Sequence, residues 1–158
     1  MGYAFNADEI LEMAERLERN GANFYREAAQ NVLDPQAKKM LIQLSQMEEN
    51  HENTYKELRA SLKNDEKTAT VFDPDNESMA YLRALADTRV FFDAKIDLKS
   101  MEEILKAAIM AEKESIVFYL GMKEIVQNSL GEKRIEQIIN EEMGHITLLS
   151  RELIAARQ

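Results

Sequence analysis

Apolar side chains recur every three or four residues along four long segments of the chain, the spacing that places them on one face of an α-helix. This spacing predicts helices over residues 7–31, 35–62, 100–128 and 131–156. Only five Gly and two Pro interrupt the 158 residues, as expected for long helices rather than many short strands. The pattern therefore predicts an all-α fold, a four-helix bundle.

The residues between the segments indicate where helices begin and end. Asp34 can cap the second helix, with Pro35 in its first turn, where a missing N–H costs nothing. Ser100 and Glu103 have the spacing of a capping box at the start of the third helix. Gly131 is predicted to separate the third helix from the fourth. The link between the first and second helices and the link between the third and fourth are both short. Each of these two pairs of helices should therefore form an antiparallel hairpin.

The connection between the two hairpins is much longer and covers residues 63–99. Within it, Glu77–Val90 reads as a short extra helix. A crossover of this length allows the third long helix to start at the same end of the bundle as the second.

The chain also resembles itself, without gaps, at an offset of 94 residues, the separation of Glu18 and Glu112. The aligned pairs include both histidines of the chain: Glu18 with Glu112, Phe24 with Phe118, Tyr25 with Tyr119, Glu48 with Glu142, and His51 with His145. We interpret the chain as two helical hairpins related by a pseudo-twofold axis.

Each predicted helix carries a glutamate on its apolar stripe, and two helices add a histidine one turn later. These residues are Glu18, Glu48, His51, Glu112, Glu142 and His145. Buried carboxylates need partners, and no Lys or Arg lies near them on the same stripes. Protonation is one solution, and two divalent cations, whose charge matches four carboxylates, are another. Mixed carboxylate and imidazole ligands suit iron or manganese, with zinc as a less fitting substitute.

One Glu on each of two helices, with Glu-x-x-His on each of the other two, is the ligand pattern of ferritin-like di-iron bundles. The repetition of the pattern at one offset makes a chance match improbable. We therefore interpret the six residues both as the ligands of two iron ions and as the catalytic centre.

Charge and composition narrow the classes of partner. The net charge is −9 and no basic stripe is visible, so nucleic acid is not an expected partner. The absence of Cys excludes a disulfide framework and a thiol nucleophile. No apolar stretch approaches the ~18 residues of a membrane span, and Met1–Asn6 lacks the start of a secretion signal. We expect a cytoplasmic protein that does not enter a membrane.

The sequence resembles the rubrerythrin family over nearly its whole length. The segments that carry the resemblance are ERNGANFY at 18–25, MEENH at 47–51, EKESIVFY at 112–119 and EEMGH at 141–145. The resemblance implies a single ferritin-like di-iron domain over residues 1–158 that reduces hydrogen peroxide or dioxygen. It implies terminal carboxylates at Glu18 and Glu112, bridging carboxylates at Glu48 and Glu142, and one metal-binding histidine per ion at His51 and His145.

Two departures from the family pattern matter. Rubrerythrin proper carries a four-cysteine rubredoxin module, and it has a further glutamate where this chain has Ser115. We therefore expect electrons to come from a separate donor protein. The four-Glu, two-His set is also shared with ferroxidase centres of the bacterioferritin type.

Two alternatives remain open. The chain could be a ferritin-like ferroxidase that handles iron, or a metal-stabilised interaction module that contacts a partner through residues 63–99. We expect a homodimer, and the long connection is compatible with exchange of hairpins between chains.

Two tyrosines and three glutamates near the motifs are not among the predicted ligands. The hydroxyls of Tyr25 and Tyr119 can hydrogen-bond the ligand carboxylates, or the two rings can be ordinary core aromatics. Glu49, Glu52 and Glu141 flank the motifs but lie off the apolar stripes, so we expect them to be solvated.

Overall fold

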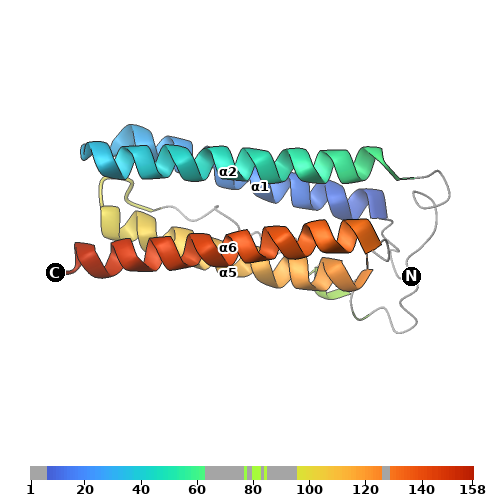
Figure 1. The fold of residues 1–158 in the computed structure, drawn as a ribbon. Helices are drawn as coiled ribbons and strands as arrows, with labels where there is room; N and C mark the ends of the chain where they lie inside the picture. Colours follow the sequence, from blue (N-terminus) through green and yellow to red (C-terminus); the bar gives the residue numbers. More distant parts are fainter. Residues whose placement is uncertain (1–6, 63–76, 78–79, 83, 85–95, 126–128) are drawn as a thin grey trace.

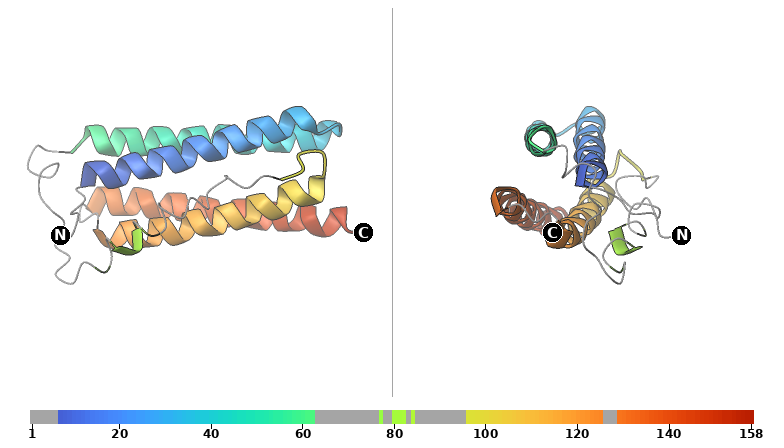
Figure 2. Two further views of the ribbon diagram at one scale, coloured as in Figure 1. Left: turned by 180° about the vertical axis from the view of Figure 1, so that it is seen from behind. Right: turned by 90° about the vertical axis from the view of Figure 1, so that its right-hand side faces the viewer.

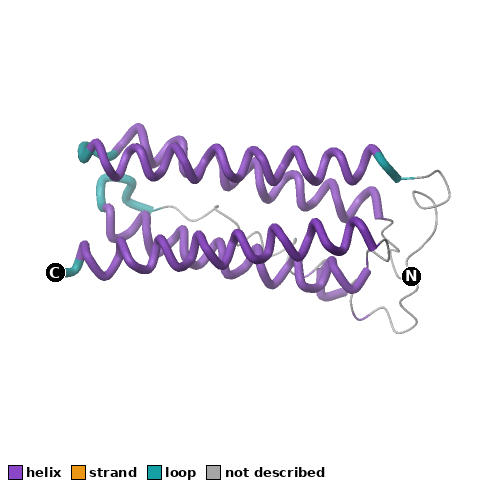
Figure 3. The backbone as a smooth tube through the Cα atoms, viewed as in Figure 1, coloured by secondary structure: helices purple, strands orange, loops and turns teal. Residues whose placement is uncertain are grey.

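The structure, a computed structural model, describes most of the chain, namely residues 7–62, 77, 80–82, 84, 96–125 and 129–158. Four long helices lie side by side (Figure 1): α1 (Ala7–Asn31), α2 (Pro35–Ala60), α5 (Met101–Ile125) and α6 (Ser129–Ala156). Every regular element in these described residues is a helix (Figure 3). The predicted all-α bundle is confirmed.

The helices pair as two antiparallel hairpins, α1 with α2 and α5 with α6 (Figure 1). The end-on view places α1 beside α5 and α2 beside α6, so that the four helices surround a common interior (Figure 2). Helices α2 and α5 start at the same end of the bundle, as expected for hairpins joined by a long crossover.

Helix α2 begins where its sequence predicts. The Asp34 carboxylate accepts a hydrogen bond of 2.8 Å from the Ala37 backbone N–H, and Pro35 opens the first turn. This bond satisfies one of the amide groups that every helix start leaves unpaired. The helix ends at Ala60, two residues before the predicted end, and Ser61 caps it.

Only half of the predicted capping box forms at the start of α5. The Ser100 hydroxyl accepts from the Glu103 amide at 3.3 Å. The Ser100 amide donates to the Asp97 backbone carbonyl at 3.1 Å, and not to the Glu103 side chain that a capping box would use as the acceptor. The predicted end of this helix, residues 126–128, lies outside the described residues.

The prediction that Gly131 separates α5 from α6 is wrong. Helix α6 begins at Ser129, and Gly131 lies buried in its first turn. A glycine costs little there, because the first residues of a helix contribute few backbone hydrogen bonds.

Most of the predicted helix Glu77–Val90 lies outside the described residues, but Glu77, residues 80–82 and Ala84 are helical. Tyr81 and Leu82 pack against α5 at Gly121, where an added methyl group would lie 3.0 Å from the Tyr81 ring and 3.1 Å from Leu82. The absence of a side chain at Gly121 permits this close approach.

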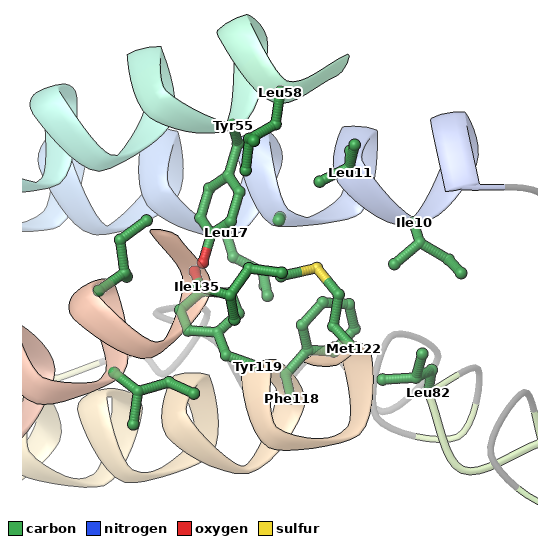
Figure 4. Close-up of a cluster of buried hydrophobic side chains, with 13 residues drawn as sticks. Ile10, Leu11, Leu17, Tyr55, Leu58, Leu82, Phe118, Tyr119, Met122 and Ile135 are labelled. Carbon is green, nitrogen blue, oxygen red and sulfur yellow. The ribbon is translucent and has the colours of Figure 1, made fainter. Parts of the chain in front are cut away.

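The apolar core divides into two clusters, one towards each end of the bundle. The first contains Ile10, Leu11, Ala14, Leu17, Tyr55, Leu58, Leu82, Phe118, Tyr119, Met122, Ile135, Ile138 and Ile139 (Figure 4). The second contains Tyr25, Ala28, Ala29, Val32, Leu41, Leu44, Ile104, Leu105, Ala108 and Leu149. Each fully buried Leu, Ile or Phe side chain stabilises the fold by about 1.5–3 kcal/mol. The burial of the two apolar clusters can therefore offset the free energy that a buried polar layer between them costs.

No helix in the described part of the chain is long and apolar enough to span a membrane.

Candidate metal centre

A layer of buried polar side chains crosses the bundle between the two apolar clusters. It contains all six residues predicted from the sequence: Glu18 on α1, Glu48 and His51 on α2, Glu112 on α5, and Glu142 and His145 on α6. Each is at most 3% exposed. The apolar stripes of the four helices therefore bring these residues into one interior site.

Their ligand atoms form two overlapping groups. One group contains Glu18, Glu48, His51 and Glu142, and the other contains Glu48, Glu112, Glu142 and His145. Within each group, one ligand atom from every residue lies within 4.8 Å of the others. The two residues shared by both groups are the two for which the resemblance implies a bridging role.

Both histidines turn the Nδ1 atom towards the carboxylates. His51 Nδ1 lies 2.7 Å from Glu142 Oε1 and 3.4 Å from Glu18 Oε2. His145 Nδ1 lies 3.2 Å from Glu48 Oε1 and 3.4 Å from the nearest oxygen of Glu142. The two rings are stacked, with centroids 5.7 Å apart, so the two groups are adjacent.

Many of these buried atoms make no well-oriented hydrogen bond within the described residues, despite their proximity. They are Glu18 Oε2, Glu48 Oε1, His51 Nδ1, Glu112 Oε2, both oxygens of Glu142 and His145 Nδ1. Unsatisfied buried polar atoms are rare in folded proteins, because each costs about 1–3 kcal/mol. Atoms that converge on a common point without bonding to one another are arranged as metal ligands are, so the residues fit a pair of metal ions.

Burial and mutual repulsion perturb the carboxyl groups. The pKa of Glu48 and the pKa of Glu112 are raised well above the ordinary value, first by burial and then by neighbouring carboxylates. The pKa of Glu18 is also raised, by burial and by Glu142. Burial alone would raise the pKa of Glu142, but its contacts with Glu112 and both histidines lower it well below its usual range. In the described part of the chain, no Lys or Arg pairs with any of these four carboxylates.

Burial has the opposite effect on the pKa of the histidines, but their carboxylate neighbours outweigh it. Burial alone would lower the pKa of His51, but contacts with Glu142 and Glu18 raise it to about 12. Contacts with Glu112 and Glu142 likewise outweigh burial and raise the pKa of His145 to about 10. The carboxylates therefore favour protonated imidazoles in the metal-free site. Metal ions must displace these protons when they bind.

Two tyrosines connect the carboxylates across the bundle. The Tyr25 hydroxyl on α1 donates to Glu112 on α5, and the Tyr119 hydroxyl on α5 donates to Glu18 on α1. Burial raises the pKa of both phenols well above the ordinary value, and the carboxylates raise it further, so both remain donors. Tyr25 and Tyr119 therefore hydrogen-bond the candidate ligand carboxylates, which was the first of the two interpretations of these residues.

The expectation that Glu141 is solvated holds only in part, because 39% of its side chain is exposed but its carboxylate also contacts the candidate centre. His51 Nε2–H donates to Glu141 Oε2 at 2.7 Å, and the side chain of Gln137 donates to Glu141 Oε1 at 3.1 Å. This contact could not be predicted from helical periodicity, because residue 141 lies off the apolar stripe. Only the packing of α6 against α2 brings its carboxylate to His51.

Glu52 is not solvated. It is 7% exposed, and Arg19 and Lys56 lie 2.8 Å and 2.7 Å from its carboxylate. Glu49 is on the surface and pairs with Arg26. The pairs of Arg19 with Glu52 and of Arg26 with Glu49 join α1 to α2 and do not reach the candidate centre.

Tyr55 on α2 is a further buried tyrosine beside the candidate centre. It is fully buried, and its ring centroid lies 5.3 Å from that of Tyr119 (Figure 4). Burial, and then the charges of Glu18 and Glu142, raise the pKa of its hydroxyl. At the 94-residue offset its counterpart is Leu149, so the two halves of the site differ here.

Four helices that surround buried carboxylates and histidines in two overlapping groups define the class of ferritin-like carboxylate bundles. The rubrerythrin family model matches residues 9–153, and the chain belongs to this family. The resemblance noted in the sequence is thereby confirmed.

The fold is also similar to a crystal structure described as a ferritin-like diiron-carboxylate protein from Thermotoga maritima. The TM-score is 0.72 at 24% identity, and the match covers 97% of each chain. At this identity the match confirms the ferritin-like fold alone. No curated protein matches the chain.

Proposed function

We propose that the chain is a di-iron redox enzyme that reduces hydrogen peroxide or dioxygen with electrons from a separate donor protein. One observation carries the proposal: six buried carboxylate and imidazole side chains converge in two overlapping groups, with no Lys or Arg to neutralise them in the described residues. Structural stability does not explain this arrangement, because apolar residues of the same size would hold the bundle better.

The residues divide into roles by their geometry. Glu48 and Glu142 would contact both ions, Glu18 and His51 would complete one position, and Glu112 and His145 would complete the other. Two iron ions bound there would supply electrons for reduction of the oxidant. Manganese has similar ligand preferences, and zinc would bind as an inert substitute.

The protein itself would contribute rigidity and exclusion of water. Tyr25 and Tyr119 fix the orientation of two carboxylates, and the apolar clusters above and below the layer keep bulk water out.

Ferritin-like iron oxidation is the second candidate. Ser115, buried one turn after Glu112, supplies no carboxylate. The candidate ligands are therefore four carboxylates and two imidazoles, the set that ferroxidase centres of the bacterioferritin type also use. A ferroxidase would use the same ligands but release iron after oxidation. Storage would also require a hollow multimer, whereas the redox enzyme needs no more than the proposed homodimer.

The test is anaerobic loading of the metal-free protein with Fe²⁺, followed by measurement of bound iron per chain and of the rates with hydrogen peroxide and with dioxygen. Two retained ions per chain and a faster peroxide reaction would support the peroxidase. A faster dioxygen reaction with loss of iron would support the ferroxidase, as would a cage-sized mass in gel filtration. Stoichiometric binding should be lost in Glu142→Ala/His145→Ala and kept in Glu49→Ala, which removes an exposed carboxylate. A protein that binds neither iron nor manganese would refute the proposal.

A further inference from the structure

The two halves of the candidate centre differ at the outer nitrogen of each histidine. His51 Nε2–H donates to Glu141 at 2.7 Å. His145 Nε2 is equally buried and has no hydrogen-bond partner among the described residues. The residue that corresponds to Glu141 at the 94-residue offset is Met47, whose thioether cannot replace a carboxylate.

Glu141 is placed to hold the ring of His51. Its second oxygen is fixed by Gln137 at 3.1 Å, while 39% of its side chain remains exposed. Its carboxylate is therefore held on one side by Gln137 and on the other by His51. Glu141 belongs to neither group of candidate ligands, so it acts on the centre only through His51.

A hydrogen bond from Nε2–H to a carboxylate has two effects on a metal-binding histidine. It fixes the tautomer that leaves the Nδ1 lone pair free, and it makes Nδ1 a stronger donor. In His51 the Nδ1 atom is the one that faces the carboxylates. For His145 the same tautomer leaves a buried N–H without an acceptor in the described residues, which weakens it as a ligand.

We propose that Glu141 is a positioning residue that makes the two metal positions unequal, so that the position at His51 fills before the position at His145. This inference rests on the proposed di-metal function and deepens it. Loss of such a partner typically weakens metal binding about 10- to 100-fold, which is large enough to separate two binding steps.

The test is an anaerobic titration of the metal-free protein with Fe²⁺, and in parallel with Mn²⁺ followed by its electron paramagnetic resonance signal. We expect two steps with dissociation constants at least about tenfold apart. A crystal grown with one equivalent of Mn²⁺ should show the ion by anomalous scattering on the side of His51.

Two variants change the asymmetry in opposite directions. Glu141→Gln should weaken the first step about 10- to 100-fold, so that the two steps merge. Met47→Glu places a carboxylate at the corresponding position for His145 and should strengthen the second step. A purely structural role of Glu141 would not produce this gain. Glu49→Gln, which alters the exposed carboxylate next to Glu48, should leave both steps unchanged.

The outcomes separate this inference from the proposed function. Two equal steps that Glu141→Gln does not alter, or a first ion on the side of His145, would overturn the inference and leave the di-metal function standing. A protein that takes up no metal would overturn both.

Discussion

Tyr119 on α5 donates its hydroxyl hydrogen bond to Glu18 on α1, in the other hairpin, and not to Glu112 on its own helix. The corresponding bond from Tyr25 to Glu112 crosses in the opposite direction. The pseudo-twofold repeat is thus expressed as two reciprocal bonds that join the hairpins at the candidate centre. Each carboxylate is oriented by the hairpin that does not carry it, so the centre depends on the correct packing of both.

Removal of either hydroxyl should weaken metal binding more than it weakens the fold. Tyr119→Phe keeps the buried ring and loses one hydrogen bond, which should cost about 1 kcal/mol of unfolding free energy. Metal affinity should fall about tenfold or more, because Glu18 is no longer held in place. Denaturant unfolding and metal titration measure the two effects. Tyr81→Phe, at a tyrosine that is 41% exposed, is the matched control, and equal losses of affinity in both variants would contradict the role of Tyr119.

The stability of the metal-free protein should fall as the pH rises. Glu48, Glu112, His51 and His145 all have a raised pKa in the fold, so each holds more protons when folded than when unfolded. Their contribution is present below the unfolded pKa values and is lost as the pH rises through the folded ones. Glu142, whose pKa is lowered, has the opposite effect, but only in acid.

Thermal unfolding checks this pH dependence. Between about pH 5 and pH 9, the melting temperature of the metal-free protein should fall, and the gain on adding Mn²⁺ should grow, because metal ions replace the protons more easily at higher pH. A metal-free melting temperature that rises across this range would show that the carboxylates are neutralised in another way.

The sequence predicted the residues that share a helical face better than it predicted contacts between helices. Periodicity placed Glu18 and His51 on inward stripes, because the spacing along one helix determines its buried face. The bond from His51 to Glu141 could not be predicted, since it depends on how closely α6 approaches α2. Gly131 shows a related limit: a glycine can end a helix or lie in its first turn, and the local sequence does not distinguish these cases.

The start of α2 is a local feature that the sequence predicted fully, and its contribution can be measured. Asp34→Ala removes the carboxylate that accepts from the Ala37 amide at 2.8 Å and should cost about 1 kcal/mol. Asp34→Asn keeps an acceptor at the same place and should be nearly neutral. Denaturant unfolding would distinguish the two, and a neutral Asp34→Ala would mean that water satisfies this amide equally well.

Two helical glycines should respond differently to the same substitution. Gly144→Ala adds a methyl group that meets nothing within 4 Å and should stabilise the protein by about 0.5–1 kcal/mol through helix propensity. Gly121→Ala has the same intrinsic gain, but its methyl group would press on Tyr81 and Leu82, so the net effect should be smaller or negative. Equal gains in denaturant unfolding would show that the contact between residues 81–82 and α5 yields easily.

A functional centre that costs stability should become more stable when one of its buried carboxyl groups is removed. Glu48 is 2% exposed and belongs to both ligand groups, and one of its oxygens makes no hydrogen bond in the described residues. Glu48→Met fills the same space without a buried carboxyl group and should stabilise the metal-free protein by about 1–4 kcal/mol at neutral pH. It should also abolish stoichiometric binding at both metal positions, because both lose a shared ligand. Glu49→Met, at the exposed neighbour, should change stability by less than about 0.5 kcal/mol and leave metal binding intact. If Glu48→Met destabilised the metal-free protein while Glu49→Met did not, the Glu48 carboxylate would be a stabilising part of the core, and its burial would no longer point to a metal centre.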